Sequence, residues 1–252
     1  MANKFPSLQV AVAEKRALGI QALLSASQKP DVIVMDDAFQ HRYVKPGFAV
    51  VLIDYNRPVW NDFFLPAGNL REPISSLNRA NCVIITKCPA NLSEDKATQI
   101  KERLKLSKDQ SLYFTTLDYG KLYPLISENS ITENLQDYTI IALSGIASPQ
   151  PFLNQVQSLS NNMIPISFKD HRDFNKNEIH KISKVWESID NPRKIIITTE
   201  KDAVKLKELE QFAAQWVKQT FVQPLEIKFL FGQQNNFNTE INNYVRKNKS
   251  NR

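Results

Sequence analysis

Three short apolar runs, each followed by polar or charged residues, dominate the first third of the chain. They cover residues 32–35, 48–53 and 81–87, and the first two lead into the carboxylates of Asp36 and Asp54. Uninterrupted apolar runs of this length are typical of strands buried on both faces of a parallel sheet. A further strand is predicted over residues 5–13, and a helix over residues 14–25. The pattern therefore predicts an α/β fold with a parallel sheet.

Helical spacing appears next in residues 93–106, where Ala97, Ile100 and Leu104 share one face. After a strand at 111–116 and a polar stretch to residue 136, a second alternation of strands and helices begins. Strands are predicted at 138–143, 164–168, 194–198 and 224–231, and helices after residue 149 and at 177–189, 209–217 and 238–246. We predict two domains, residues 1–112 and a second, smaller α/β domain with its linker over residues 113–252.

Composition and charge narrow the class of protein. The 252 residues carry a formal net charge of +6, but the basic residues are interleaved with acids except in the short tail from Arg246 to Arg252. No RNA-binding aromatic motif accompanies them, so we expect no nucleic-acid partner. A mild positive charge suits phosphorylated substrates or an anionic membrane face equally well. No apolar run approaches the roughly 20 residues that a membrane-spanning helix needs, and the two cysteines, Cys82 and Cys88, are expected to be free thiols.

Several side chains that could take part in binding or catalysis follow directly after the first apolar run. Asp36 and Asp37 stand side by side there, followed by Gln40, His41 and Arg42. In open α/β sheets ligands gather at the carboxyl ends of strands, and two carboxylates at that place suit a phosphate-bound Mg²⁺. Capping of the following turn explains the same two acids equally well.

A second candidate is the aperiodic stretch from residue 55 to residue 73, which contains Trp60, Phe63 and Phe64. Its last part, residues 65–73, holds Gly68, Arg71 and Glu72. Arginine suits phosphate oxygens and glutamate suits a hard metal ion, while an Arg–Glu pair that braces a proline-rich loop is the structural alternative. We expect Asp36, Arg71 and Glu72 to lie on the same side of the sheet.

Two further segments carry charge near strand ends. His171, within residues 170–173, is a candidate general base or a residue that orients one, and a structural role is the alternative. The segment Thr199–Asp202 is explained as well by helix capping as by function. None of the six glycines belongs to a complete G-x-x-x-x-G-K-[ST] or G-x-G-x-x-G pattern, so the printed sequence contains no complete phosphate cradle.

Taken together, five segments resemble the tetraacyldisaccharide 4'-kinase family, the lipid A 4'-kinases. Residues 36–41 are similar to the family's Asp-Asp-Gly-Phe-Gln-His, with Ala38 in place of glycine, and residues 65–73 to its Leu-Pro-Ala-Gly-Pro-Leu-Arg-Glu-Pro, with Asn69 in place of proline. Residues 144–149 resemble its Ser-Gly-Ile-Ala-x-Pro turn. Residues 170–174 resemble its Asp-His-His-x-Phe, with Arg172 at the second histidine, and residues 199–205 its Thr-Glu-Lys-Asp-Ala-Val-Lys.

The resemblance implies an enzyme that transfers the γ-phosphoryl group of ATP, with Mg²⁺, to the 4'-hydroxyl of a tetraacyldisaccharide 1-phosphate, giving lipid IVA. It implies catalytic roles for His171, Arg71 and Asp37, and nucleotide contacts for Gln40, His41 and Arg71. Magnesium and its waters would be held by Asp36, Asp37, Gln40 and Glu72. The first domain would be the C-terminal part of a P-loop-kinase-like parallel sheet, and the protein would lie peripherally on the cytoplasmic face of the bacterial inner membrane.

The resemblance also has a gap. Family members carry a membrane-associating helix, a P-loop and a Gly-Asp-Glu-Pro segment before the region that matches Met1. We therefore expect this chain to be an N-terminally truncated form with negligible kinase activity alone, because the β- and γ-phosphates lose their main donors. The alternative is a non-catalytic lipid- or protein-binding module that keeps the kinase fold. A basic nucleic-acid-binding protein is the third hypothesis.

Overall fold

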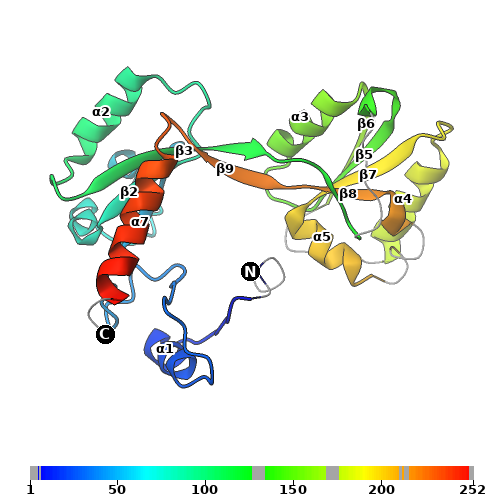
Figure 1. Cartoon of the computed structure of the whole chain (residues 1–252). Coiled ribbons are helices and arrows are strands. Elements are labelled where there is room, and N and C mark those ends of the chain that lie inside the picture. Colours follow the sequence, from blue (N-terminus) through cyan, green and yellow to red (C-terminus); the bar gives the residue numbers. More distant parts are fainter. Residues whose placement is uncertain are drawn as a thin grey trace. The chain divides into compact units, whose positions relative to one another are not determined.

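The computed structural model describes residues 5, 7–126, 134–168, 176–209, 212 and 216–249. The chain divides into two compact units. Unit 1 comprises Met1–Leu117 and Ile227–Arg252, and unit 2 comprises Asp118–Glu226. The two units are described separately below (Figure 1).

Unit 1 is built on a four-stranded sheet in the order β1-β2-β3-β9. Its strands are β1 Val50–Asp54, β2 Cys82–Thr86, β3 Ser111–Tyr119 and β9 Leu225–Phe229. β1 and β2 are parallel, with Val51 opposite Val83, and β2 and β3 are parallel as well. Helix α2, Glu94–Leu104, connects β2 to β3 and begins at Ser93, whose hydroxyl accepts a hydrogen bond from the Lys96 amide. The parallel arrangement that the apolar runs predict is confirmed for β1 and β2.

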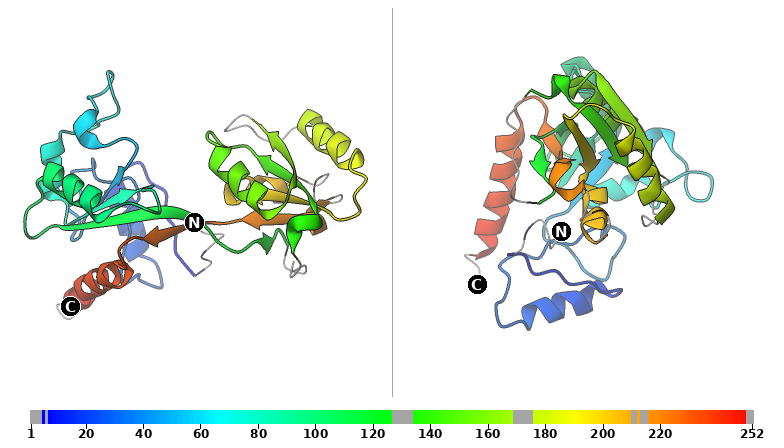
Figure 2. Two further views of the ribbon diagram at one scale, coloured as in Figure 1. Left: turned by 90° about the horizontal axis from the view of Figure 1, so that it is seen from above. Right: turned by 90° about the vertical axis from the view of Figure 1, so that its right-hand side faces the viewer.

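The two faces of this sheet are covered by different helices (Figures 1 and 2). Val83 and Ile85 of β2 point to the face where Ile100 and Leu104 of α2 complete a buried cluster. Cys82 and Ile84 alternate to the opposite face, where the C-terminal helix α7, Gln234–Lys249, packs. Phe237 and Glu240 of α7 contact Tyr113 of β3, Phe237 with its ring and Glu240 through a 2.7 Å hydrogen bond from the phenol. Both cysteines are free, as predicted, and both are buried.

Unit 2 contains a five-stranded sheet in the order β4-β8-β7-β5-β6. β5 is parallel to β6 and β7, β7 is parallel to β8, and β4 is antiparallel to β8. One face packs against α3, through Phe152 and Val156, and the other against α4 and α5, through Ile182 and Leu206 (Figure 1). The elements are β4 Tyr123–Pro124, β5 Thr139–Ser144, α3 Gln150–Leu159, β6 Asn162–Ser167, α4 Lys176–Glu187, β7 Lys194–Thr199, α5 Glu200–Lys207 and β8 Thr220–Gln223.

Short 3₁₀ turns complete both units. They are Val59–Asn61 and Ile74–Arg79 in unit 1, and Leu135–Asp137 and Val217–Gln219 in unit 2. No helix of the described residues has the length and apolarity to span a bilayer.

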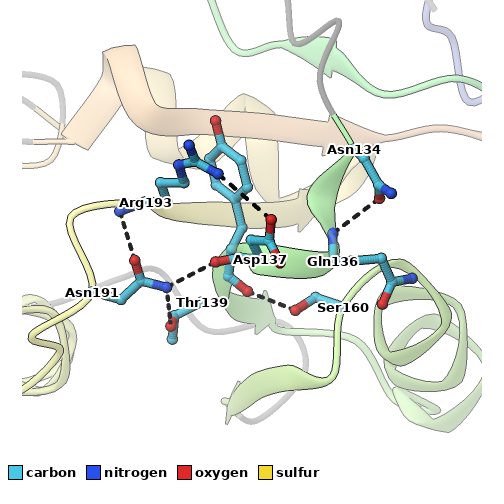
Figure 3. Close-up of polar contacts among 8 residues, drawn as sticks. Asn134, Gln136, Asp137, Thr139, Ser160, Asn191 and Arg193 are labelled. Atoms are coloured by element: carbon cyan, nitrogen blue, oxygen red, sulfur yellow. Dashed lines mark hydrogen bonds and ion pairs between the residues drawn. The ribbon is translucent and has the colours of Figure 1, made fainter.

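Polar side chains fasten the edge of the unit 2 sheet where β5 and β7 begin (Figure 3). The Asn191 side-chain amide donates to the Asp137 carbonyl at 2.9 Å and to the Thr139 hydroxyl at 3.2 Å, and its oxygen accepts from the Arg193 amide. Ser160 donates to the Tyr138 carbonyl at 2.6 Å. The polar groups at the amino ends of β5 and β7 are therefore occupied by structural hydrogen bonds. The segments 144–149 and 199–205, which resemble the family's motifs, begin at the carboxyl ends of the same two strands.

Two predicted strands do not form. Residues 32–35 make no strand pairing, and Val32 and Val34 are 48% and 87% exposed. Residues 7–13 are also without regular structure, although the helix predicted next to them forms as α1, Arg16–Leu24. The reason is that a strand requires a partner for its backbone. β1 pairs only with β2, so no described strand lies on its other edge, and its Leu52 remains 65% exposed.

The predicted domain limits also change. We predicted 1–112 and 113–252, but unit 2 begins at Asp118, and residues 227–252 return to unit 1. The strand predicted over residues 224–231 forms as β9, Leu225–Phe229, but it joins the β1-β2-β3-β9 sheet, whereas the preceding strand β8 ends at Gln223 and belongs to the unit 2 sheet. The helix predicted over residues 209–217 falls largely outside the described residues.

Candidate functional site

The acidic segment lies in a turn that precedes β1. The His41 amide donates to the Ala38 carbonyl at 2.9 Å, which closes the turn directly after the two aspartates. Asp37 has a positive φ of 45°, a left-handed backbone conformation that aspartate tolerates better than most residues. Asp36, Asp37 and Gln40 are exposed, and His41 is half-buried. The acids therefore do not extend from a buried strand end, as the sequence predicts, but from an exposed turn.

The second candidate segment is a closed loop, residues 62–72, which we call the arginine loop. Asp62 fastens its base, because the same carboxylate oxygen accepts the amides of Phe63 at 2.8 Å and Asn69 at 3.1 Å. The Leu70 amide donates to the Phe63 carbonyl at 3.0 Å. Gly68 lies so close to this base that a Cβ there would come within 2.3 Å of the Phe63 carbonyl oxygen. Only glycine fits, and the loop delivers Arg71 and Glu72 at its end.

The two segments, far apart in sequence, meet through charged pairs. Arg71 Nη1 lies 3.1 and 3.0 Å from the two carboxylate oxygens of Asp37. Arg42, which follows the acidic turn, lies 3.3 Å from Glu72 Oε1. The acidic segment and the arginine loop therefore lie together, as we expect, and the contacts that join them are Asp37–Arg71 and Arg42–Glu72.

Arg79 joins the same cluster and was not singled out by the sequence. Its guanidinium forms an ion pair with Glu72, donates to the Phe39 carbonyl at 3.2 Å, and lies 4.2 Å from the centre of the Phe39 ring. Arg79 ends the 3₁₀ turn Ile74–Arg79, so it binds both segments from a third. No motif signals this role, because only the fold brings residue 79 to residues 39 and 72.

The cluster holds Glu72 in its charged form. Burial by itself raises the pKa of a carboxyl group, but a hydrogen bond from Ser76 and the guanidinium groups of Arg42 and Arg79 outweigh it and hold the pKa of Glu72 below its ordinary value. The Glu72 side chain is only 13% exposed, whereas the Asp37 side chain is 70% exposed. Glu72 therefore braces the cluster, and Asp37 and Arg71 face solvent, where a ligand has access.

The donor set suits magnesium. Mg²⁺ prefers carboxylate oxygens, keeps several waters, and is usually bound through one or two carboxylates together with substrate phosphates. Asp36 and Asp37 offer two exposed carboxylates in one turn, which fits that chemistry. Among the described residues no group of three or more histidine, cysteine or acidic side chains converges as an all-protein metal cage. His171 lies outside the described residues.

Two of the five signature segments fasten each other in unit 2. Asp202, 2% exposed, accepts the Gly145 amide at 2.8 Å and the Thr199 hydroxyl at 2.7 Å through one oxygen. The Thr199 hydroxyl in turn accepts the Asp202 amide at 3.2 Å, which caps helix α5. A Cβ on Gly145 would lie 3.0 Å from the Asp202 carboxylate. The capping interpretation of residues 199–202 is therefore confirmed, and the buried carboxylate also holds the turn that follows β5.

Two cavities of unit 1 lie beside these segments, and neither of them is lined by the acidic turn or by Arg71 and Glu72. The larger opening, about 450 Å³, includes Asp62 and Asn69 of the arginine loop. The other, about 230 Å³, lies between α2 and the segment that follows β1. Asp54 at its edge is paired with Lys87 at 2.6 Å. Although burial by itself raises the pKa of Asp54, the bonds from Lys87 and Asn56 hold it below its ordinary value.

Comparison with known proteins places these segments in a family context. A family model described as "Tetraacyldisaccharide-1-P 4'-kinase" matches residues 1–246. A protein named tetraacyldisaccharide 4'-kinase from Phocaeicola vulgatus is 39% identical over 256 residues, which cover 100% of this chain and 70% of that protein. A protein of the same name from Flavobacterium johnsoniae is 42% identical over 247 residues, covering 98% of this chain and 68% of its own length.

A solved structure is similar as well. The crystal structure of LpxK from Aquifex aeolicus in complex with ATP superposes with a TM-score of 0.62 at 22% identity, covering 93% of this chain and 64% of that chain. This likeness confirms the predicted α/β fold class. The chain spans about 70% of the length of the Phocaeicola vulgatus relative.

Proposed function

Because the chain belongs to the tetraacyldisaccharide-1-P 4'-kinase family, we propose that it contributes the acidic and arginine-bearing part of a lipid kinase. The reaction is transfer of the γ-phosphoryl group of ATP to the 4'-hydroxyl of an acylated disaccharide 1-phosphate, a lipid A precursor. The observation that carries the proposal is the contact between Asp37 and Arg71, with both side chains open to solvent. The lipid substrate implies peripheral contact with the cytoplasmic face of the inner membrane.

Arg71 has the central role in this proposal. Phosphoryl transfer depends mainly on positioning and on stabilising the charge that spreads over the transferred group. A guanidinium offers a planar set of N–H donors to the phosphate oxygens, and Asp37 pre-orients it before the nucleotide arrives. Glu72, held charged by Arg42 and Arg79, keeps the loop that carries Arg71 in place.

The remaining assignments follow the family. Asp36, Asp37, Gln40 and Glu72 would hold Mg²⁺ and its waters, which would supply positive charge beside the phosphates. Gln40, His41 and Arg71 contact the nucleotide. His171 would act as a general base or orient one.

The experiment that tests the proposal uses a chimera. Whatever part of the Phocaeicola vulgatus relative precedes its match to residue 1 is joined in front of residue 1. Transfer of radiolabelled γ-phosphate from ATP to tetraacyldisaccharide 1-phosphate is then measured. We expect activity from the chimera, and little or none from the 252 residues alone, whose sequence contains no P-loop pattern.

A matched pair of variants locates the chemistry. Arg71→Ala in the chimera is expected to lower kcat by roughly 100-fold or more, the usual effect of removing one donor to a developing charge. Arg193→Ala, which removes a guanidinium that pairs with an exposed carboxylate of unit 2, is expected to leave kcat unchanged. A folded chimera that binds the lipid without transferring phosphate would favour the non-catalytic binding module. Normal turnover in Arg71→Ala would refute the role of the arginine loop.

A further inference from the structure

Two adjoining cavities open between the carboxyl end of β1 and the base of the arginine loop. Pro58 and Asn61 line both of them, so the two cavities are neighbours, and we call the pair the depression. We call the part under α2 the aromatic cavity (Tyr55, Trp60, Lys96, Gln99 and Arg103) and the part beside the loop the amide cavity (Asn56, Arg57, Asn61, Asp62 and Asn69). We propose that this depression binds the phosphorylated saccharide of the acceptor lipid, an inference that rests on the proposed function.

The aromatic cavity has the chemistry of an anion site beside a ring. Lys96, Gln99 and Arg103 occupy positions i, i+3 and i+7 of α2, which places them on one stripe of the helix. The Arg103 guanidinium lies 5.8 Å from the centre of the Trp60 ring. Among the described residues, neither Lys96 nor Arg103 has a carboxylate within ion-pair distance. Two cations without acidic partners and a half-buried indole fit a phosphate attached to a ring.

The amide cavity has the chemistry of hydroxyl recognition. Asn61 and Asn69 each present an amide that both donates and accepts hydrogen bonds, as the hydroxyl groups of a sugar do. One oxygen of Asp62 already accepts two backbone amides, which leaves the second oxygen as an acceptor for a hydroxyl. The indole of Trp60, in the neighbouring aromatic cavity, would supply an apolar surface on which the sugar ring can stack.

Charge in the whole depression favours a phosphorylated ligand over a neutral one. Its two carboxylates are engaged within the protein, Asp54 by Lys87 and Asp62 by the backbone of the arginine loop. Arg57, Lys96 and Arg103 add three positive charges to the lining. The lining therefore has more cations than carboxylates, which favours a ligand that carries a phosphate group.

The surroundings suit an acylated ligand. Phe63, Phe64 and Leu65 follow directly after Asp62 and are 71%, 52% and 63% exposed. Three large, exposed apolar side chains on an internally bonded loop are placed to contact acyl chains. Asn69 lies two residues before Arg71 in the chain, so a sugar in the amide cavity is next to the residue that we assign to the phosphoryl group.

The test is a binding measurement that requires no catalysis. The full 252-residue chain, labelled with ¹⁵N, is titrated with glucosamine 1-phosphate while the indole N–H of Trp60 and the side-chain amides of the asparagines are followed by NMR. Glucosamine and inorganic phosphate are titrated in parallel. We expect glucosamine 1-phosphate to shift the Trp60, Asn61 and Asn69 signals, and to bind more tightly than either fragment.

Variants decide which side chains carry the binding. Lys96→Ala together with Arg103→Ala is expected to weaken binding by about tenfold or more, which corresponds to about 1.4 kcal/mol or more, because both cations of the site are lost. Asn61→Ala is expected to weaken the sugar phosphate but not inorganic phosphate. Lys101→Ala, on the same helix but outside the lining, is the matched control and is expected to bind normally.

Three results would overturn the inference: no shift at Trp60, unchanged affinity in the double variant, or equal affinity for inorganic phosphate, which indicates a plain anion site. The outcome is separable from that of the proposed function. Binding here without transfer in the chimera would leave this site standing and reject the kinase. If the chimera still transfers phosphate after Lys96 and Arg103 are both replaced, the kinase function would stand and this binding site would be rejected.

Discussion

The buried carboxylate of Asp202 offers the sharpest test of how the signature segments of unit 2 are used. Replacement by alanine removes the acceptor of the Gly145 amide and of the Thr199 hydroxyl, at 2.8 and 2.7 Å. A buried donor left without a partner costs about 1–3 kcal/mol, and the lost acid in the first turn of α5 costs a further ~0.3–1 kcal/mol. We expect Asp202→Ala to lower the free energy of unfolding of unit 2 by about 2–4 kcal/mol.

Urea unfolding followed by tryptophan fluorescence measures this loss. Trp186 and Trp216 both pack on the unit 2 core, and a Trp60→Phe background removes the signal of unit 1. Asp202→Asn keeps one acceptor oxygen and is expected to lose roughly half as much. Asp137→Ala is the control, because that side chain is 80% exposed and pairs with Arg193 only at 3.6 Å, a contact worth less than about 0.5 kcal/mol.

A loss below about 1 kcal/mol for Asp202→Ala would refute the reasoning, since the Gly145 amide would then have found another partner or water. A loss in the Asp137 control equal to that of Asp202→Ala would refute it as well, because burial would then not decide the cost. An unchanged stability together with loss of activity in the chimera would instead assign Asp202 to the chemistry.

Three further outcomes follow from unit 1. Burial and, after it, the Glu240 carboxylate raise the pKa of Tyr113 to about 12. Glu240→Ala is therefore expected to lower this pKa toward 10, as measured by ultraviolet titration of tyrosinate. An unchanged pKa would mean that burial is the whole cause. Gly68→Ala is expected to cost roughly 1–3 kcal/mol of unfolding free energy in urea, because its Cβ meets the Phe63 carbonyl, and a neutral result would mean that the loop relaxes. Glu72 has a pKa below 4.5, so its stabilisation is complete above about pH 4.5 and is lost as the pH falls through the folded-state pKa. The stability difference between the wild type and Glu72→Gln is therefore expected to shrink in acid, and a difference independent of pH would contradict the ion pairs.

Local patterns were sufficient wherever an element carries its own signal. The stripe Ala97, Ile100 and Leu104 identifies α2, and Ser93 marks its beginning, because helix period and capping are properties of neighbouring residues. The runs that became β2, β5 and β7 are recognised in the same way, since a strand buried on both faces is apolar throughout. The thiol of Cys82 is buried for this reason, and burial raises its pKa to about 12.

The same patterns fail where a partner decides the outcome. Val32–Met35 is as apolar as β2, yet it forms no strand, because backbone pairing is supplied by another segment and not by composition. Residues 227–252 were assigned to the second domain because they follow it in the chain. They belong to the first, because Phe237, Glu240 and Tyr244 of α7 contact Tyr113 and Phe48 there.

The candidate site shows the same division. By itself the sequence determined which chemical groups are present, since Asp36, Asp37, Arg71 and Glu72 are visible in their motifs. Only the tertiary structure decided that Asp37 contacts Arg71, and that Glu72 is held by Arg42 and by Arg79, which no motif marks. The physical reason is that charge and polarity are properties of a single residue, whereas an ion pair depends on the distance between two residues. The distance between residues 37 and 71 is fixed by the fold.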